Sequence, residues 1–163
     1  MTTARLPIFI LIDTSGSMSG EPAAILAQHL RRLHDLMRAD SLIGARADIC
    51  LISFGNDAQL MRSLAPVDRF DFPSELNPAG ATATGAAMEL MLAERAKLLS
   101  ASHSKSLPPV ALLISDGAAT DDFDAVIGRM DALPWSARVA WGIPCADEAQ
   151  LSRFVGGQGG RSY

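Results

Sequence analysis

The chain has 163 residues, of which 48% are hydrophobic, and a formal net charge of −4 at pH 7. This size and composition predict one domain over residues 1–163 with a substantial core, and the acidic balance gives no electrostatic reason to expect nucleic acid as a partner. No segment reaches the ~18 apolar residues of a membrane span and no signal peptide precedes the first strand, so we expect a cytoplasmic protein. We also expect a monomer. The two cysteines, Cys50 and Cys145, lie in or beside apolar runs and are expected to be buried free thiols.

The first predicted element is a strand covered on both faces, because residues 8–12 form a continuous apolar run without alternation. The run ends at Asp13, and Ser15 and Ser17 follow with Gly16 between them. Open α/β sheets place their ligands at this end of a strand. Oxygen donors without nearby Cys or His suit a hard cation such as Mg²⁺, Mn²⁺ or Ca²⁺, and argue against zinc. The same residues could instead only cap the next helix and bond the turn.

An amphipathic helix is predicted from about residue 20 to 38, and its His29 and His34 are expected at the surface or rim. A second buried strand follows over residues 48–54, and the more polar run 59–64 is expected to be an antiparallel edge strand. The proline-bearing segment 66–78 then returns across the surface towards the ligand end of the sheet.

Residues 80–85 form a small-residue loop before a helix that we expect over residues 84–99. Small side chains allow the backbone of this loop to approach another group closely. Thr82 and Thr84 are the only polar side chains in the loop. In the helix, Met88 and Met91 are expected in the core, with Glu94, Arg95 and other charged residues outside.

Residues 110–115 repeat the opening pattern, because an apolar strand again ends at an aspartate, Asp116. Two parallel strands of this kind can place both carboxylates in one crevice. A helix to about residue 133, a strand over 138–143 and a short helix around 148–154 complete the pattern. The alternation predicts an α/β fold with a doubly wound, mostly parallel sheet, one antiparallel edge strand and helices on both faces.

Three separated segments together resemble the metal-ion-dependent adhesion site of a von Willebrand factor A (VWA) domain. They are Asp13-Thr14-Ser15-Gly16-Ser17, Gly80-Ala81-Thr82-Ala83-Thr84-Gly85 and Ile114-Ser115-Asp116-Gly117. The resemblance implies that Ser15, Ser17 and Thr82 present hydroxyls to the cation, while Asp13 and Asp116 bind it directly or through water. Thr84 is the nearby alternative to Thr82, which is preferred because the family's threonine follows the glycine by two positions.

A Mg²⁺-like ion held by only two carboxylates stays electrophilic and can accept a further oxygen. In VWA domains that oxygen comes from a Glu or Asp of a protein partner. The resemblance therefore implies metal-bridged protein recognition without enzymatic chemistry.

Within the family, the opening residues 5–22 and the run from Ser115 to Asp122 are similar to the bacterial TerY-type proteins. These accompany tellurite-resistance and stress-response gene sets and are thought to work beside a protein kinase and a PP2C-type phosphatase. Family members usually continue into a sixth strand and a last helix, whereas we expect this chain to stop where that strand begins, so that its C-terminal strand and helix are cut short.

Two other functions remain open. A haloacid-dehalogenase-like phosphohydrolase would use Asp13 as nucleophile and Asp116 to hold Mg²⁺, but it needs an aspartate at position 15, where this chain has serine. A VWA scaffold with a vestigial metal site is the other alternative. No phosphate-binding G-x-x-x-x-G-K-[ST] sequence supports an NTPase.

Overall fold

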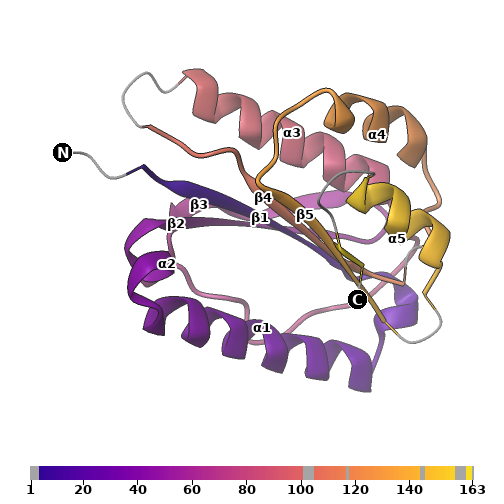
Figure 1. Cartoon of the computed structure of the whole chain (residues 1–163). Helices are drawn as coiled ribbons and strands as arrows, with labels where there is room; N and C mark the ends of the chain where they lie inside the picture. The colour runs from indigo at the N-terminus through magenta and orange to yellow at the C-terminus, as the bar shows by residue number, and fades with distance from the viewer. Residues whose placement is uncertain (1–3, 101–104, 117, 144–145, 157–160, 163) are drawn as a thin grey trace.

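Strands and helices alternate along most of the chain. The computed structural model describes residues 4–100, 105–116, 118–143, 146–156 and 161–162. In chain order the elements are β1 (Leu6–Asp13), η1 (Gly16–Met18), α1 (Glu21–Ala39), α2 (Ser41–Arg46), β2 (Ala47–Phe54), β3 (Ala58–Pro66), η2 (Val67–Arg69), α3 (Thr84–Ser100), β4 (Val110–Ser115), α4 (Phe123–Asp131), β5 (Ala137–Gly142), α5 (Glu148–Val155) and β6 (Arg161–Ser162). Figure 1 shows α3, α4 and α5 on one side of the sheet and α1 with α2 on the other.

The sheet has six strands in the order β3-β2-β1-β4-β5-β6. β1 pairs in parallel with both β2 and β4, β4 pairs in parallel with β5, and β3 runs antiparallel to β2 at one edge. The predicted doubly wound, mostly parallel sheet with one antiparallel edge strand is therefore confirmed.

β1 lies at the centre of the sheet, and its side chains enter both layers of the core. Phe9 and Leu11 pack towards α3, α4 and α5, whereas Ile10 and Ile12 pack towards α1. All four side chains are 0% exposed. This double coverage explains why the β1 sequence is apolar at every position rather than at alternate ones.

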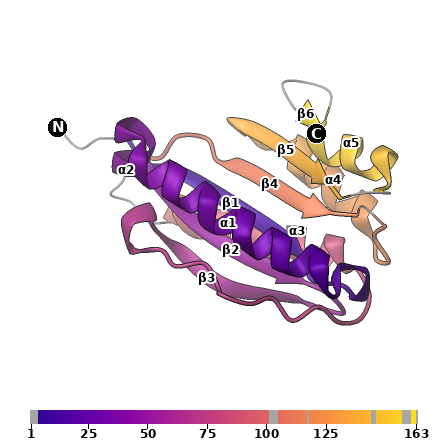
Figure 2. The same ribbon diagram turned by 90° about the horizontal axis from the view of Figure 1, so that it is seen from below.

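Helix α1 lies along β1 and β2 on its face of the sheet (Figure 2). The expectation of surface positions holds for His29, which is exposed and stacks on Trp141 with ring centroids 5.7 Å apart. It is wrong for His34, which is buried with Nε2 2.8 Å from the carbonyl oxygen of Val67. Val67 and Phe70, in the segment after β3, pack against α1 and shield His34 from solvent.

Helix α3 is also more buried than its sequence indicates. Glu94 and Arg95, expected outside, are only 5% and 7% exposed. The Arg95 guanidinium lies over the Trp135 ring at 5.1 Å and donates a hydrogen bond to the carbonyl oxygen of Pro134. The loop after α4 therefore covers a helix face that the charges alone mark as solvated.

The C-terminal residues that the structure describes add a short sixth strand. Residues 161–162 pair in parallel with Val139 and Ala140 of β5, so the strand that we expected to be cut short is present over two residues. Within the described part of the chain, no helix is both long enough and apolar enough to cross a membrane. Cys50 is a buried free thiol as expected, and Cys145 lies outside the described residues.

Candidate metal centre

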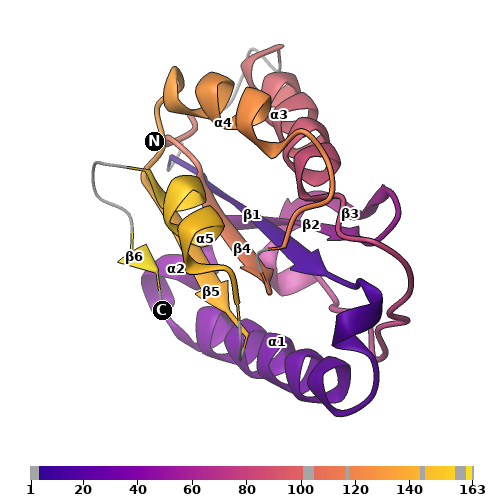
Figure 3. The same ribbon diagram turned by 90° about the vertical axis from the view of Figure 1, so that its right-hand side faces the viewer.

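Three loops meet at the carboxyl end of the parallel strands. The arrowheads of β1, β4 and β5 in Figure 3 point towards one end of the sheet, where these loops begin. The loop after β1 bonds to the small-residue loop through Gly16 N–H to Gly80 O at 3.0 Å and Ala79 N–H to Thr14 O at 2.8 Å. The loop after β4 joins through Thr120 N–H to Thr82 O at 2.9 Å. Segments far apart in sequence are thus fixed side by side by backbone hydrogen bonds.

Gly80 makes this close approach possible. Its φ is +81°, a left-handed conformation that residues with a side chain rarely adopt. A Cβ built on Gly80 would lie 2.2 Å from Oδ1 of Asn56, the same atom that accepts a 2.8 Å hydrogen bond from Ala81 N–H. The predicted close approach of the loop backbone is confirmed, and the positive φ together with the Asn56 contact favours glycine at this position.

Four of the five predicted ligands form one hydrogen-bonded group. Asp13 Oδ1 accepts from Ser15 N–H at 2.8 Å. The hydroxyls of Ser15 and Ser17 are 2.9 Å apart, and Ser17 donates to Oδ2 of Asp116 at 2.5 Å. Because the single hydroxyl hydrogen of Ser17 goes to Asp116, the hydrogen between the two serines comes from Ser15. Two carboxylates and two hydroxyls therefore meet in one place.

The fifth predicted ligand, Thr82, lies between the loops after β1 and β4 and is 6% exposed. Its backbone N–H donates to Thr120 Oγ1 at 3.3 Å, which fixes the loop at this point. Thr84, the alternative, is 2% exposed, and its hydroxyl oxygen has no hydrogen-bond partner in the described structure. A buried hydroxyl without a partner costs free energy, so Thr84 stays an alternative donor for a bound ion.

Asp13 is the buried charge of the group, since its side chain is 0% exposed. Burial raises the pKa of Asp13 above its usual value, and the nearby negative charge of Asp116 raises it further, against the opposing effect of hydrogen bonds from Ser115 and Ser15. The hydrogen-bond donors of Asp13 in the described structure are serine hydroxyls and a backbone amide, all uncharged. A bound cation would supply the missing positive charge.

The donor set fits a hard divalent cation. Two carboxylates and several hydroxyls are all oxygen ligands, as Mg²⁺ and Mn²⁺ prefer. Among the described residues, no group of three or more His, Cys, Asp or Glu side chains could hold a metal. A zinc site or a calcium site built mainly from carboxylates is therefore not found there, and a hydroxyl-rich site is the type that these residues can form.

Two residues of the group received no role from the sequence. Ser115, the last residue of β4, donates to Asp13 Oδ2 at 2.6 Å. The N–H of Thr120 donates to the carbonyl oxygen of Thr82, and Thr120 Oγ1 accepts a hydrogen bond from Thr82 N–H. Because these contacts join residues far apart in sequence, only the position of Ser115 beside the strand-end aspartate could have marked it in advance.

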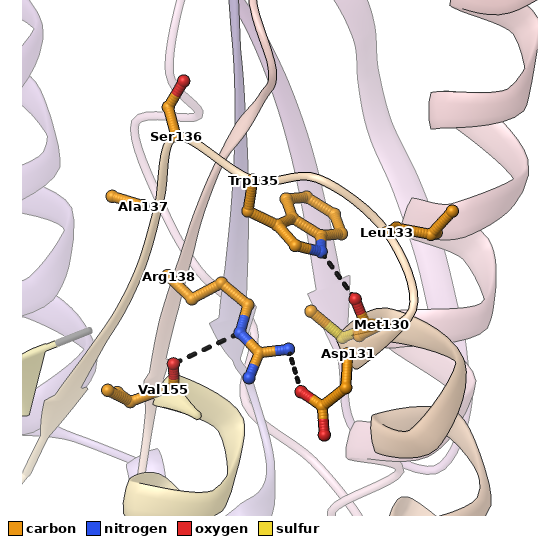
Figure 4. Close-up of a pocket in the computed structure, with 8 residues that line it drawn as sticks. All are labelled: Met130, Asp131, Leu133, Trp135, Ser136, Ala137, Arg138 and Val155. Atoms are coloured by element: carbon orange, nitrogen blue, oxygen red, sulfur yellow. Dashed lines mark hydrogen bonds and ion pairs between the residues drawn. The ribbon is translucent and has the colours of Figure 1, made fainter. Parts of the chain in front are cut away.

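A pocket of about 340 Å³ lies at the opposite end of β5 (Figure 4). The buried Arg138 crosses it, donating through Nε to the carbonyl oxygen of Val155 at 3.2 Å and pairing with Asp131 at 2.7 Å. Trp135 closes one side and donates to the carbonyl oxygen of Met130. The contact with Asp131 is an ion pair without hydrogen-bond geometry at Nη1. These contacts tie the ends of α4 and α5 to the sheet, which is a structural role.

We compared the chain with known proteins by sequence and by structure. No protein-family model matches the chain, and no curated protein matches it in sequence. Solved structures do match: the manganese-loaded TRAP protein of Plasmodium vivax has a TM-score of 0.67 at 17% identity, over 98% of this chain and 68% of that one. The PilB minor pilin of Streptococcus sanguinis gives 0.74 at 12% identity, over 98% and 57% of the two chains.

The VWA domain of SpRpn10 gives a TM-score of 0.66 at 14% identity, over 98% of this chain and 87% of that chain. The match therefore covers nearly the whole of this chain and most of the other. Identities this low establish the fold and no more. The fold of this chain is that of a VWA domain.

Proposed function

We propose that this protein is a metal-dependent protein-interaction module. The observation that carries the proposal is the hydrogen-bonded group of Asp13, Ser15, Ser17 and Asp116, which gathers only oxygen donors at the carboxyl end of the sheet. These residues, with Thr82, would hold Mg²⁺, Mn²⁺ or Ca²⁺. When bound, such an ion supplies a Lewis-acid position that a carboxylate oxygen of a partner can occupy.

The charge of the surrounding loops supports metal dependence. The described residues of the loops at this end, 14–20, 55–57, 75–83, 116, 118–122, 143 and 146–147, include no Lys, Arg or His. Their acids are Asp57, Glu75, Asp116, Asp121, Asp122 and Asp147. Without an ion, this rim repels an acidic ligand at short range. A partner carboxylate therefore binds only with the ion present, and Lys or Arg beside that carboxylate would strengthen binding.

Helix N-termini reduce the repulsion but do not cancel it. Asp121, Asp122 and Asp147 each accept a backbone N–H at the start of α3, α4 or α5. Each helix N-terminus carries only about half a positive charge, less than the carboxylate that caps it. The rim stays negative after these caps are counted.

A polar pocket offers room for the rest of a partner segment. It measures about 350 Å³ and begins at Thr14, next to the candidate metal ligands. Asn56, Asp57, Glu75 and Asn77 line it. Amide and carboxylate groups of this kind suit a hydrogen-bonding or basic side chain that flanks the metal-binding acid.

The structural neighbours agree with this function. TRAP was crystallised loaded with manganese, and PilB is a minor pilin. Metal binding by the same fold supports a divalent cation here. A minor pilin with this fold supports an interaction role in place of an enzymatic one.

The phosphohydrolase alternative fits the geometry less well. A nucleophilic aspartate must reach the phosphorus of its substrate. Asp13 is 0% exposed, and both of its oxygens accept hydrogen bonds. Sustained turnover of an aryl phosphate that is lost in Asp13→Asn would favour the enzyme over the interaction module.

The finer setting that we propose is bacterial stress response. The motifs around Asp13 and Asp116 are similar to those of TerY-type proteins. This similarity supports a cytoplasmic role beside tellurite-resistance proteins, with a protein kinase and a PP2C-type phosphatase as partners. A vestigial metal site on the same scaffold is the alternative that the following experiment addresses.

The test is capture of partners on immobilised protein with Mg²⁺, followed by elution with EDTA. Ser15→Ala removes a ligand hydroxyl, and Ser19→Ala, an exposed serine in the same loop, is the matched control. We expect proteins that elute with EDTA from the wild type and the control but are not captured by Ser15→Ala. Replacing the acid of a captured partner with its amide should abolish capture. Equal capture with and without EDTA would contradict the proposal.

A further inference from the structure

Ser115 holds the carboxylate of Asp13 from the neighbouring strand. Its hydroxyl donates to Asp13 Oδ2 at 2.6 Å across 102 residues of sequence. Ser15 N–H occupies the other oxygen, Oδ1, at 2.8 Å. Both Ser115 and Asp13 are 0% exposed, so water does not replace either contact.

The contact closes a ring of bonds at the end of the sheet. Starting from Ser115, hydrogen bonds run through Asp13, Ser15 and Ser17 to Asp116, which is the next residue after Ser115 in the chain. The ring therefore joins the carboxyl ends of β1 and β4 through side chains as well as through the strand pairing. Removing the Ser115 hydroxyl breaks this ring of hydrogen bonds at the bond to Asp13, where both residues are 0% exposed.

We infer that Ser115 is a positioning residue of the metal site. It sets the orientation of the Asp13 carboxylate before an ion arrives, and it does so without adding charge. Metal sites depend on such outer groups, which orient the ligands and typically change metal affinity by about 10–100-fold when removed. The inference rests on the proposed metal site and adds a residue outside the set of ligands.

Ser115 suits this positioning role because its hydroxyl is neutral, whereas a positively charged side chain next to Asp13 would not be. Elsewhere in the molecule a buried guanidinium pairs with the carboxylate, as Arg138 does with Asp131. A guanidinium beside Asp13 would satisfy the carboxylate but repel a divalent cation. The Ser115 hydroxyl satisfies one oxygen of Asp13 and leaves its negative charge for the ion.

The experiment compares Mn²⁺ affinity, measured by calorimetric titration, with the stability of the same variants in EDTA. Ser115→Ala should weaken Mn²⁺ binding at least about tenfold, and Ser115→Thr, which keeps the donor, should bind within about threefold of wild type. Ser115→Cys, a weak donor of similar size, should lie between them and replaces the alanine variant if that variant does not fold. Ser53→Ala is the control, since Ser53 is also a buried serine near the end of its strand.

A purely structural role makes a different prediction. Ser115→Ala and Ser115→Cys would then lower stability in EDTA but bind Mn²⁺ as tightly as the wild type, and that result overturns the inference alone. Failure of Ser115→Thr to restore affinity would overturn it as well. Absence of Mn²⁺ binding by the wild-type protein would overturn the proposed metal site and this inference together.

Discussion

Carboxylates at the two ends of the sheet have different partners. At the amino end, Asp48 pairs with Arg5 and Asp131 pairs with Arg138, so each acid faces a guanidinium. The hydrogen bond that Arg5 donates to Asp48 raises the pKa of Arg5. At the carboxyl end, Asp13 and Asp116 face hydroxyls and amides instead.

The difference separates a structural site from a binding site. An acid paired with arginine is satisfied within the chain and holds elements together. Two neighbouring acids satisfied only by neutral donors keep a negative charge that the described residues do not balance. The second arrangement leaves a place for an external cation.

The largest expected effect is stabilisation by metal. Mn²⁺ at about 100 times its dissociation constant should raise the free energy of unfolding by about 2.7 kcal/mol, measured by urea denaturation with and without EDTA. Asp13→Asn should abolish this increment because it removes a charged ligand. In EDTA the same variant should be at least as stable as the wild type, since it removes a buried charge that lacks a counter-charge.

Asp48→Asn is the matched control at the other end of the sheet, where Asp48 pairs with Arg5. It should lower stability in EDTA and keep the full Mn²⁺ increment. An unchanged wild-type unfolding curve on adding Mn²⁺ would remove the contrast between the two ends. Retention of the increment in Asp13→Asn would show that the ion binds elsewhere.

A smaller effect is expected from Asp131→Asn at the amino end. The variant leaves the buried guanidinium of Arg138 without its carboxylate, while Asp131 itself is 53% exposed. We expect a loss of about 1–2 kcal/mol, the same with and without Mn²⁺, because solvent already weakens the exposed half of the pair. Urea denaturation measures it.

Glu89→Gln is the control for a pair in which both partners are about half exposed, Glu89 with Arg129. It should change stability by less than about 0.5 kcal/mol. If Asp131→Asn costs no more than this control, Arg138 is not held by its acid and the structural interpretation of the amino end is wrong.

The smallest effect concerns Cys50, a buried free thiol in the core. Burial raises the pKa of the Cys50 thiol to about 12, from a usual value of 9.0. Below the pKa of the thiol in the unfolded chain, the stability that this shift contributes is fully present. It is lost as pH rises from that value towards the higher pKa of the thiol in the folded protein. Between about pH 8 and about pH 9.5 the loss should be about 0.8 kcal/mol.

The measurement is the stability difference between a Cys145→Ser protein and the same protein with Cys50→Ala, at both pH values. The difference should shrink by that amount as pH rises. A constant difference, or rapid reaction of native Cys50 with a thiol reagent, would mean that the interior tolerates an unpaired anion. The contrast drawn from Asp13 would then weaken.

The sequence by itself determined the order of the elements and the chemistry of the candidate site. Continuous apolar runs predicted β1 and β4 because strands buried on both faces need no polar positions. Asp13 with Ser15 and Ser17 predicted oxygen donors for a hard cation, and the resemblance of three separated segments to a VWA metal site added Thr82 and Asp116. Only local patterns were needed for these predictions.

The tertiary structure decided which polar groups are buried and what each one contacts. His34, Glu94 and Arg95 read as surface residues, yet the segment after β3 and the loop after α4 cover them. The bond from Ser115 to Asp13 joins residues 102 positions apart. Burial and pairing depend on segments distant in the chain, so the pattern around one residue cannot specify them.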